Sequence, residues 1–313
     1  MTVVQPDHGG IVVRGVTRSF GDVHALRGVD LDALPGEVTG LVGPNGAGKT
    51  TLLLILATLL TPDAGLVRMG GHDPVADHDA VRARMGWSPD VFGLYDGLTS
   101  REYLEFFAAA YRLPTAQRRD RALELLELAR LSEFADRPVH VLSRGQKQRL
   151  GLMRALVHAP DVLLLDEPAA GLDPRSRVEL RELLRRLAVQ GVALLVSSHV
   201  LSDLEELADA IVFVDAGRTV GAHRINELPQ SLVARPWRIR ALDERALVAA
   251  LDKAAVPHSA PSPTGVDVQL AGDAEAAALL AKLVRGKVAV VSCQPVSGAL
   301  ESTFLDLTEG SKA

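Results

Sequence analysis

The segment "GPNGAGKT", residues 43–50, constrains the fold of this chain more than any other stretch. It fits the pattern G-x-x-x-x-G-K-[ST] and lies between a strand-like run, "EVTGLVG", and a helix-like run, "GKTTLLLILATLL". Glycines allow such a loop to turn its backbone N–H groups toward phosphate oxygens, and the following helix points its positive end at them. A glycine-rich turn that binds nothing is the alternative, which these flanks disfavour. The predicted nucleotide-binding residues of the loop are Gly43, Pro44, Asn45, Gly46, Ala47, Gly48, Lys49, Thr50 and Thr51.

Side chains of this loop and of a second motif have expected roles in phosphate chemistry. Lys49 is expected to reach the β- and γ-phosphates, and the Thr50 hydroxyl to bind Mg²⁺. In "VLLLDEP" the apolar run is typical of a strand buried on both faces, and Asp166 at its carboxyl end would also bind Mg²⁺. Glu167 would polarise a water molecule as a general base. A strand that only ends in surface acids is the alternative, and these motifs leave ATPase, GTPase and kinase activities open.

The composition is that of an ordinary folded protein. The chain has 313 residues, enough for about two domains, with 47% hydrophobic and 23% charged residues. A formal net charge of -5 gives no global basic field for nucleic acid, and the single cysteine, Cys293, suits a reducing cytoplasm. No secretion signal is expected, and the apolar run at 52–60 is shorter than the about 18–20 residues that span a bilayer.

The first part of the chain alternates strand-like and helical segments. Residues 10–20 and 24–34 are expected to form antiparallel strands. Residues from about 85 to 160 turn helical, and Thr99 with Glu102 three positions later is a capping-box signature. These segments predict a chain of mixed strands and helices, with an antiparallel part at its start and a helical part at about 85–160.

The chain changes character near residue 224, where Pro and Ala become frequent. Strand-like segments, an amphipathic helix at 243–254 and a loop at 256–265 indicate a small appended α+β domain. We therefore predict a nucleotide-binding domain at 10–223 and an accessory domain at 224–313.

A third motif, "LSRGQKQRL", carries several cations and runs straight into helix-like sequence. The segments "GPNGAGKT", "LSRGQ" and "LLLDEPAAGLDP" in this order, followed by "VSSH", resemble the ATP-binding subunits of ATP-binding cassette (ABC) transporters over roughly residues 10–220. The signature "LSRGQ" is specific, because GTPases and nucleotide kinases have no counterpart. "GLYDGLT" and the C-terminal "LESTFLDLTEG" resemble the branch of stand-alone bacterial export subunits. The resemblance implies the ABC ATPase form of the P-loop NTPase fold, which is an α/β core with a mixed sheet, an antiparallel β part and a helical subdomain.

In this family two subunits pair head to tail, which implies that the signature of one chain meets the ATP held by another. Ser143 would cap the helix that follows it. Its hydroxyl, with the N–H of Gly145 and the helix dipole, would contact the γ-phosphate across the dimer. Gln146 occupies the last signature position. A basic, solvated helix start is the alternative.

Three more positions carry over by resemblance. His199, after the strand "VALLVSS", corresponds to the switch histidine that contacts the γ-phosphate and holds Glu167 in place; a structural histidine is the alternative. Asp173 in "AGLDP" corresponds to the residue that links the two sites across the dimer, and a helix cap alone also fits. Phe20 lies where an aromatic ring, usually tyrosine, stacks on adenine, and a core phenylalanine is the alternative.

Two positions depart from the family pattern. Asp90, in "WSPDVFGLYDGL", stands where many relatives have a metal-contacting glutamine, so it is expected to touch Mg²⁺ through water. Arg144 replaces the usual first glycine of the signature and brings a bulky cation near the partner's phosphates, where coupling or nucleotide preference could shift. We assign Lys147 and Arg149 to the surface and to structural pairing, not to nucleic-acid contacts.

The resemblance implies ATP and Mg²⁺ as cofactors, with Glu167 and His199 as the catalytic residues. It also implies a membrane permease as partner, a dimer with a second copy or a homologous ATPase subunit, and no nucleic-acid partner. The expected location is cytoplasmic, peripheral on the inner face of the cell membrane.

Contact with the permease is expected around residues 87–110. A groove there would be lined by Trp87, Phe92, Leu94 and Tyr95, and a core position for all four is the alternative. The rival class is a soluble ABC ATPase that acts on the ribosome or DNA. Such proteins fuse two cassettes or insert long coiled coils, whereas this sequence shows one cassette and no long heptad run.

Overall fold

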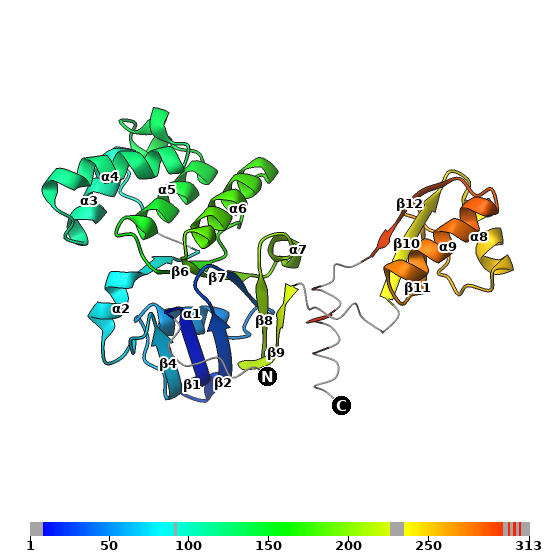
Figure 1. Cartoon of the computed structure of the whole chain (residues 1–313), viewed down its shortest axis with the longest axis horizontal. Coiled ribbons are helices and arrows are strands. Elements are labelled where there is room, and N and C mark those ends of the chain that lie inside the picture. The colour runs from blue at the N-terminus through cyan, green and yellow to red at the C-terminus, as the bar shows by residue number, and fades with distance from the viewer. Residues whose placement is uncertain are drawn as a thin grey trace. The chain divides into compact units, whose positions relative to one another are not determined.

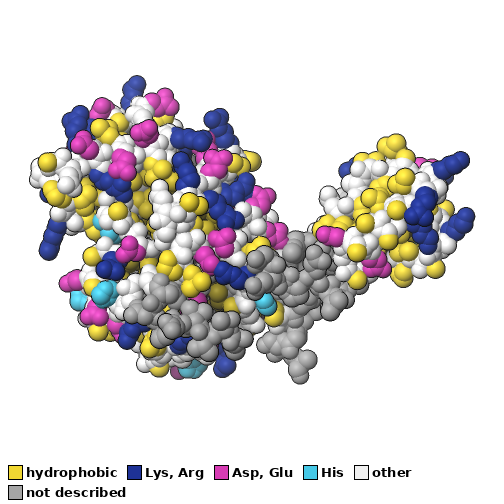
Figure 2. Space-filling model, viewed as in Figure 1, with side chains coloured by type: hydrophobic (Ala, Val, Ile, Leu, Met, Phe, Trp, Pro, Cys, Tyr) yellow, Lys and Arg dark blue, Asp and Glu magenta, His cyan; other side chains and the backbone are white. Residues whose placement is uncertain are grey.

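The computed structural model describes residues 9–90, 93–225 and 235–296, together with residues 300, 303, 304 and 307. The chain forms two compact units, Met1–Asn226 and Glu227–Ala313, each with its own hydrophobic core. Phe92 and most of the segment 300–310, which the sequence singled out, lie outside the described residues. Acidic and basic side chains are interspersed over the face seen in Figure 2, which accords with the small net charge of -5.

The central sheet of the first unit has six strands in the order β5-β6-β7-β3-β8-β9 (Figure 1). The first five run parallel and the last is antiparallel; they are β5 (Met85–Ser88), β6 (Val162–Asp166), β7 (Ala193–Ser198), β3 (Val38–Val42), β8 (Ala210–Asp215) and β9 (Arg218–Arg224). Every residue of β3, β6 and β7 is buried, as their apolar runs predict for strands covered on both faces. The loops that follow the parallel strands therefore meet at one edge.

A second, antiparallel sheet of the first unit has the order β2-β1-β4. The pairing of β1 (Ile11–Phe20) with β2 (Val23–Ala33) confirms the predicted antiparallel strands, whereas β4 (Ala64–Met69) was not anticipated. One core joins residues of both sheets to the apolar face of α1 (Lys49–Leu56), so the helix after the phosphate loop is fixed from both sides.

The helical subdomain contains α3 (Ser100–Ala110), α4 (Thr115–Leu128) and α5 (Arg144–Leu156), with short 3-10 turns at Ser132–Phe134 and Val139–Val141. The predicted helical range is wrong at its start, because residues 85–88 form β5. Four residues, "MGWS", are too few to show a strand period, and only their pairing with β6 defines the strand. The remaining helices of this unit are α2 (His78–Arg84), α6 (Pro174–Val189) and α7 (Leu201–Glu205).

The second unit has α+β architecture. Its sheet has the order β11-β10-β12, with both pairs antiparallel. The elements are β10 (Arg235–Ala241), α8 (Glu244–Lys253), β11 (Val266–Leu270), α9 (Asp273–Arg285) and β12 (Val290–Pro295). Alternate strand residues such as Trp237, Ile239 and Val268 pack against leucines of the two helices. In the parts of the chain that the structure describes, no helix combines the length and apolarity needed to cross a bilayer.

Candidate active site

The predicted residues of the phosphate loop and the two motifs that follow β6 and β7 lie at the carboxyl edge of the parallel strands, whose order Figure 1 shows. The phosphate loop follows β3, and Asp166 ends β6, which pairs with Ser197 of β7. His199 follows β7 directly, and β7 pairs with β3 through Ser198 and Val42. The topology thus brings the phosphate loop at 43–50 next to Asp166, Glu167 and His199, which follow it by more than a hundred positions in the sequence.

The phosphate loop needs glycine at two of its positions for steric reasons. A Cβ atom on Gly43 would lie 2.1 Å from the Val214 carbonyl oxygen. A Cβ atom on Gly48, whose φ is +102°, would lie 2.7 Å from the Ala25 carbonyl oxygen. The loop is therefore held tightly against β2 and β8, with its backbone fixed before any ligand binds.

Lys49 is the buried cation of the loop, with only 8% of its surface exposed. Its Nζ atom donates to the carbonyl oxygens of Gly43 and Pro44, at 2.6 and 3.1 Å. Burial lowers the pKa of Lys49, and the charges of Glu167 and Asp166 oppose that shift. A phosphate group placed here would add the negative charge that most favours the ammonium form.

Asp166 lies between two hydroxyl groups and is 5% exposed. Thr50 Oγ1 donates to Asp166 Oδ2 at 3.3 Å, and Ser197 Oγ donates to Asp166 Oδ1 at 2.5 Å. Hard oxygen donors of this kind fit Mg²⁺. Among the described residues no group of three or more His, Cys, Asp or Glu side chains could hold a metal, so an ion at Thr50 and Asp166 would also need oxygens of the nucleotide.

Glu167 and His199 form a pair next to this hydroxyl–carboxylate group. Glu167 Oε1 lies 2.8 Å from His199 Nδ1, and the side chains are 18% and 55% exposed. Glu167 has a φ of +48°, in the left-handed region that is unusual for a side-chain-bearing residue. Its N–H is held by the carbonyl and hydroxyl oxygens of Ser197, each at 3.2 Å. Ser197 was not predicted as a site residue, although the motif "VSSH" contains it.

The signature segment forms the amino end of α5, with the predicted cap. Ser143 accepts from the Gln146 N–H at 3.3 Å, and the Gln146 side chain accepts from the Ser143 N–H at 2.8 Å. This capping box confirms Ser143 as the N-cap. A Cβ atom on Gly145 would lie 3.1 Å from Ser176 Oγ, so α5 begins in close contact with the start of α6.

Asp173 is the N-cap of α6, and Pro174 is its first helical residue, as predicted. The N–H and hydroxyl of Ser176 donate to the two Asp173 oxygens, at 3.0 and 2.6 Å. These hydrogen bonds, the hydroxyl's first, lower the pKa of Asp173. Within the described residues, no hydrogen bond joins this pair of helix starts to the phosphate loop.

Phe20 ends β1 and is 47% exposed, with the Arg18 guanidinium 5.0 Å from its ring centre. Its hairpin is tied to the phosphate loop, because Arg27 N–H donates to Gly217 O and Gly217 N–H donates to Ala47 O, at 2.7 and 3.1 Å. The exposed ring is therefore not a core side chain.

Asp90 is exposed and follows β5, at the same sheet edge as Asp166. Trp87, in β5, packs against the core of the first unit. Tyr95 is instead 52% exposed and meets the Phe106 and Phe107 rings of α3, at centroid distances of 5.3 and 6.4 Å. Of the four residues expected to line one groove, Trp87 and Leu94 are half-buried, Tyr95 is exposed, and Phe92 is not described.

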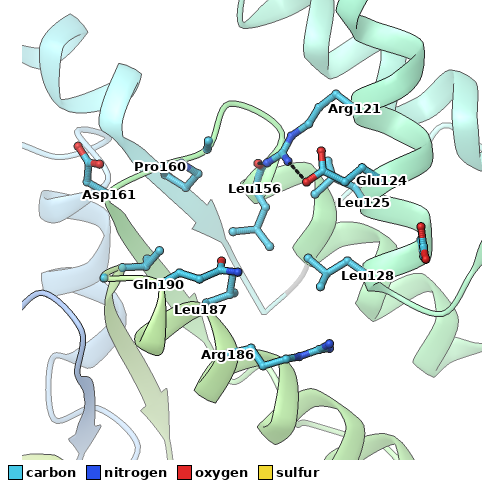
Figure 3. Close-up of a pocket in the computed structure, with 14 residues that line it drawn as sticks. Arg121, Glu124, Leu125, Leu128, Leu156, Pro160, Asp161, Arg186, Leu187 and Gln190 are labelled. Atoms are coloured by element: carbon cyan, nitrogen blue, oxygen red, sulfur yellow. Dashed lines mark hydrogen bonds and ion pairs between the residues drawn. The ribbon is translucent and has the colours of Figure 1, made fainter.

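A cleft of about 660 Å³ lies between α4, the end of α5 and the end of α6 (Figure 3). Arg121 and Glu124, both on the α4 wall of the cleft, form an ion pair at 2.9 Å. Asp161 and Val192 line it immediately before β6 and β7, so the cleft lies at the amino ends of these strands. It is on the opposite edge of the sheet from the phosphate loop and is separate from the candidate active site.

Comparisons with known proteins agree with this geometry. The family described as "ABC transporter" matches residues 26–170. The daunorubicin/doxorubicin resistance ATP-binding protein DrrA of Streptomyces peucetius is 34% identical over 305 residues, 95% of this chain and 92% of that protein. The Nod factor export ATP-binding protein I of Ralstonia nicotianae is 38% identical over 216 residues, 69% of this chain and 67% of the relative.

Solved structures give the same result. The dimeric post-hydrolysis state of the ATP-binding cassette MJ0796, bound to ADP and Pi, matches with a TM-score of 0.62 and 29% identity over 69% of this chain and 98% of that chain. The chain belongs to the ABC transporter family and is one of its ATP-binding, ATP-hydrolysing proteins. The fold class expected from the sequence is confirmed, and ATP hydrolysis is the activity among those that the phosphate loop left open.

Proposed function

We propose that this chain hydrolyses ATP as half of a head-to-tail dimer and thereby powers export through a separate membrane permease. The observation that carries the proposal is the grouping of Lys49, Asp166, Glu167 and His199 at one sheet edge, while Ser143 and Asp173 form a second, separate surface. The chain supplies both halves of a nucleotide site, and no hydrogen bond among its described residues joins them. Two copies facing each other would complete two such sites.

Within the first half, each side chain has a task that its surroundings support. Lys49 and the backbone N–H groups of residues 43–50 would bind the β- and γ-phosphates. Thr50 and Asp166 would hold Mg²⁺, which supplies neutralisation of phosphate charge. Glu167 would take the proton of the attacking water, and His199, already in contact with Glu167, would orient that carboxylate. Phe20 would stack on the adenine, and Asp90 would reach the ion through water.

The second half is the surface that joins the starts of α5 and α6. The Ser143 hydroxyl, the Gly145 N–H and the positive end of α5 would bind the γ-phosphate of the nucleotide on the partner subunit. Asp173 would link the two sites across the dimer. The MJ0796 cassette was solved as a dimer with ADP and Pi, which supports pairing of this kind. Release of the γ-phosphate removes the contact between the halves, so hydrolysis would open the dimer.

The direction of transport and the partner follow from the relatives. Proteins named for drug resistance and for Nod factor export are similar to this chain along most of its length. We therefore assign it to export, with a permease as the membrane partner and the cytoplasmic face of the membrane as its place. The exposed aromatic group of Tyr95 and Phe106 on the helical subdomain is the proposed contact surface for that permease.

The substitution Glu167→Gln tests the mechanism. It keeps the shape of the side chain but removes the base, so ATP turnover is expected to fall by about 10²–10⁴-fold. ATP should then hold the variant as a dimer, which analytical ultracentrifugation measures. Glu133→Gln, an exposed position away from the site, is the matched control and keeps full turnover. Retained multiple turnover in Glu167→Gln would contradict the base assignment.

Co-purification tests the partner. A tagged full-length chain is captured from detergent-solubilised membranes, and a polytopic membrane protein is expected to accompany it. Tyr95→Ala is expected to reduce that recovery without changing the ATPase rate of the isolated chain. Recovery of ribosomes or DNA in place of a membrane protein would favour the soluble class of ABC ATPases and contradict export.

A further inference from the structure

The Ser197 hydroxyl is a buried polar group at the candidate active site, and the proposed function gives it no task. Ser197 is the fifth residue of β7 and has 0% of its surface exposed. Its strand pairs in parallel with β6, and the register places Ser197 opposite Asp166. Burying a hydroxyl costs free energy that hydrogen bonds must offset, so the partners of this hydroxyl indicate its role.

The Ser197 hydroxyl contacts two successive residues of the site. It donates to Asp166 Oδ1 at 2.5 Å and accepts from the Glu167 N–H at 3.2 Å. A serine hydroxyl has a single hydrogen to donate, so its donor capacity goes entirely to Asp166. The other oxygen of Asp166, Oδ2, accepts from Thr50 Oγ1 at 3.3 Å. The carboxylate is therefore held at both oxygens, with Oδ2 on the side of the phosphate loop.

The two contacts of the hydroxyl differ in how far the backbone can replace them. The Glu167 N–H also donates to the Ser197 carbonyl oxygen, at 3.2 Å, and this contact does not depend on the side chain. Among the described residues, no group other than the Ser197 hydroxyl donates to Asp166 Oδ1. Loss of the hydroxyl therefore acts mainly on the Asp166 carboxylate, and less on the left-handed backbone of Glu167.

We infer that Ser197 is a positioning residue that keeps Asp166 Oδ2 beside the Thr50 hydroxyl, the pair of oxygens that would hold Mg²⁺. This inference rests on the proposed function, which assigns the ion to Thr50 and Asp166. Carboxylates that bind metals are themselves hydrogen-bonded, and loss of such a partner weakens metal binding by about 10–100-fold. The phosphate loop lies on another strand, so nucleotide affinity without the ion is expected to be independent of Ser197.

The test measures nucleotide binding and not turnover. The full chain is titrated with a fluorescent, non-hydrolysable ATP analogue in Mg²⁺ and in EDTA, and the ratio of the two Kd values is the gain that Mg²⁺ provides. Ser197→Ala is expected to reduce this gain about tenfold and to leave the Kd in EDTA unchanged. Asp166→Asn is the reference for complete loss of the gain.

Thr39→Val is the matched control. The Thr39 side chain is also buried in the central sheet, on β3, at 1% exposed. Among the described residues its hydroxyl has no hydrogen-bond partner, so its removal is expected to leave the Mg²⁺-dependent gain at the level of the parent. A loss in Thr39→Val equal to that in Ser197→Ala would contradict a specific role of Ser197.

Ser197→Thr keeps the hydroxyl and separates its effect from that of side-chain volume. This variant is expected to retain most of the Mg²⁺-dependent gain. A loss as large as in Ser197→Ala would overturn the inference, because the presence of the hydroxyl would then make no difference.

Steady-state hydrolysis shows which of the two contacts matters. In Ser197→Ala the Mg²⁺ concentration for half-maximal rate should rise, whereas kcat at saturating Mg²⁺ and ATP stays close to that of the parent. This split is expected because the Glu167 N–H keeps the carbonyl oxygen of residue 197. A fall in kcat with unchanged Mg²⁺ dependence would show that Ser197 acts through Glu167, and would contradict the inference.

The outcomes distinguish a failure of this inference from a failure of the function on which it rests. If the parent gains affinity from Mg²⁺ and Ser197→Ala gains as much, the role of Ser197 is wrong and the proposed function stands. If the parent binds the analogue equally well in Mg²⁺ and in EDTA, the metal site of the proposed function fails, and the role of Ser197 fails with it.

Discussion

Helices α3 and α5 begin with the same local device and differ in charge. In α3, Thr99 and Glu102 form a capping box, and in α5, Ser143 and Gln146 do so. Both boxes satisfy the N–H groups that a helix start leaves without partners. The helix residue that closes the box is the acid Glu102 in α3 and the neutral Gln146 in α5.

The arginines near the two starts differ in the same way. Arg101 of α3 is paired with Glu105 and Asp136, at 2.8 and 2.9 Å, so that start is neutralised inside the chain. Arg144 and Lys147 of α5 have no such acid among the described residues. A capping box alone therefore does not mark a binding site. The start of α5 keeps its positive end without an acid in the first turn, as the γ-phosphate contact under the proposed function requires.

The largest change in activity is expected when the caps Ser143 and Thr99 are each replaced by alanine. Ser143→Ala and Thr99→Ala each remove a helix cap, so each lowers the free energy of unfolding by about 1 kcal/mol. Only Ser143→Ala also removes a donor to the proposed γ-phosphate contact, and its ATP turnover is expected to fall by about 10²-fold. Steady-state ATPase rates and urea unfolding of both variants check this. Equal turnover of the two variants would reduce Ser143 to a cap.

The next effect concerns the ion pair that an arginine of each helix makes within the chain. Glu179→Gln removes the carboxylate that pairs with Arg149, and the side chains of Arg149 and Glu179 are 13% and 14% exposed. The same carboxylate also pairs with the more exposed Arg130 and Arg175. We expect a loss of about 2 kcal/mol in unfolding free energy, below the ~3–5 kcal/mol of a fully buried pair. Glu105→Gln breaks the more exposed pair with Arg101 and costs less than about 1 kcal/mol. Thermal or urea unfolding measures both, and a larger loss in Glu105→Gln would reverse the ranking.

The sequence predicted contacts between neighbouring positions at these helix starts, but not contacts between residues far apart in the chain. The capping signature of Thr99 and Glu102 spans three positions, and the Asp173-Pro174 start of α6 spans two, so both were visible as spacing. The Ser197 hydroxyl on Asp166 and the Glu179 carboxylate on Arg149 join residues about 30 positions apart, and no period records such contacts. Motif resemblance predicted the sheet-edge grouping of Glu167 and His199, whereas β5 was too short to be seen.

A further variant gives the capping box of α5 the charge that the box of α3 has. Gln146→Glu gives α5 the acidic first turn that α3 has, so the helix start gains about 0.5 kcal/mol. The same carboxylate would repel a phosphate at the start of α5. ATP-driven dimerisation in the Glu167→Gln background is therefore expected to weaken. Urea unfolding and analytical ultracentrifugation should therefore move in opposite directions. A variant that is more stable and dimerises equally well would contradict an anion at the start of α5.

The smallest effect is a difference in pH response between the boxes. Hydrogen bonds from the Thr99 N–H and hydroxyl lower the pKa of Glu102 below its ordinary value of 4.5. A carboxylate with a depressed pKa in the folded state contributes its full stabilisation above that ordinary value, and the contribution is lost as the pH falls through the folded pKa. Gln146 gains no proton in this range, so the α5 box keeps its hydrogen bonds.

The backbone amide of each N-cap reports this difference, because the Thr99 N–H donates to Glu102 and the Ser143 N–H donates to Gln146. In NMR spectra recorded from pH 6 downward to the onset of acid unfolding, the Thr99 amide shift should titrate, whereas the Ser143 amide shift stays constant. Glu102→Gln is the control that abolishes the Thr99 titration. A Ser143 amide that titrates in parallel with Thr99 would show that an acid also serves the α5 start, and the charge difference between the two helices would then disappear.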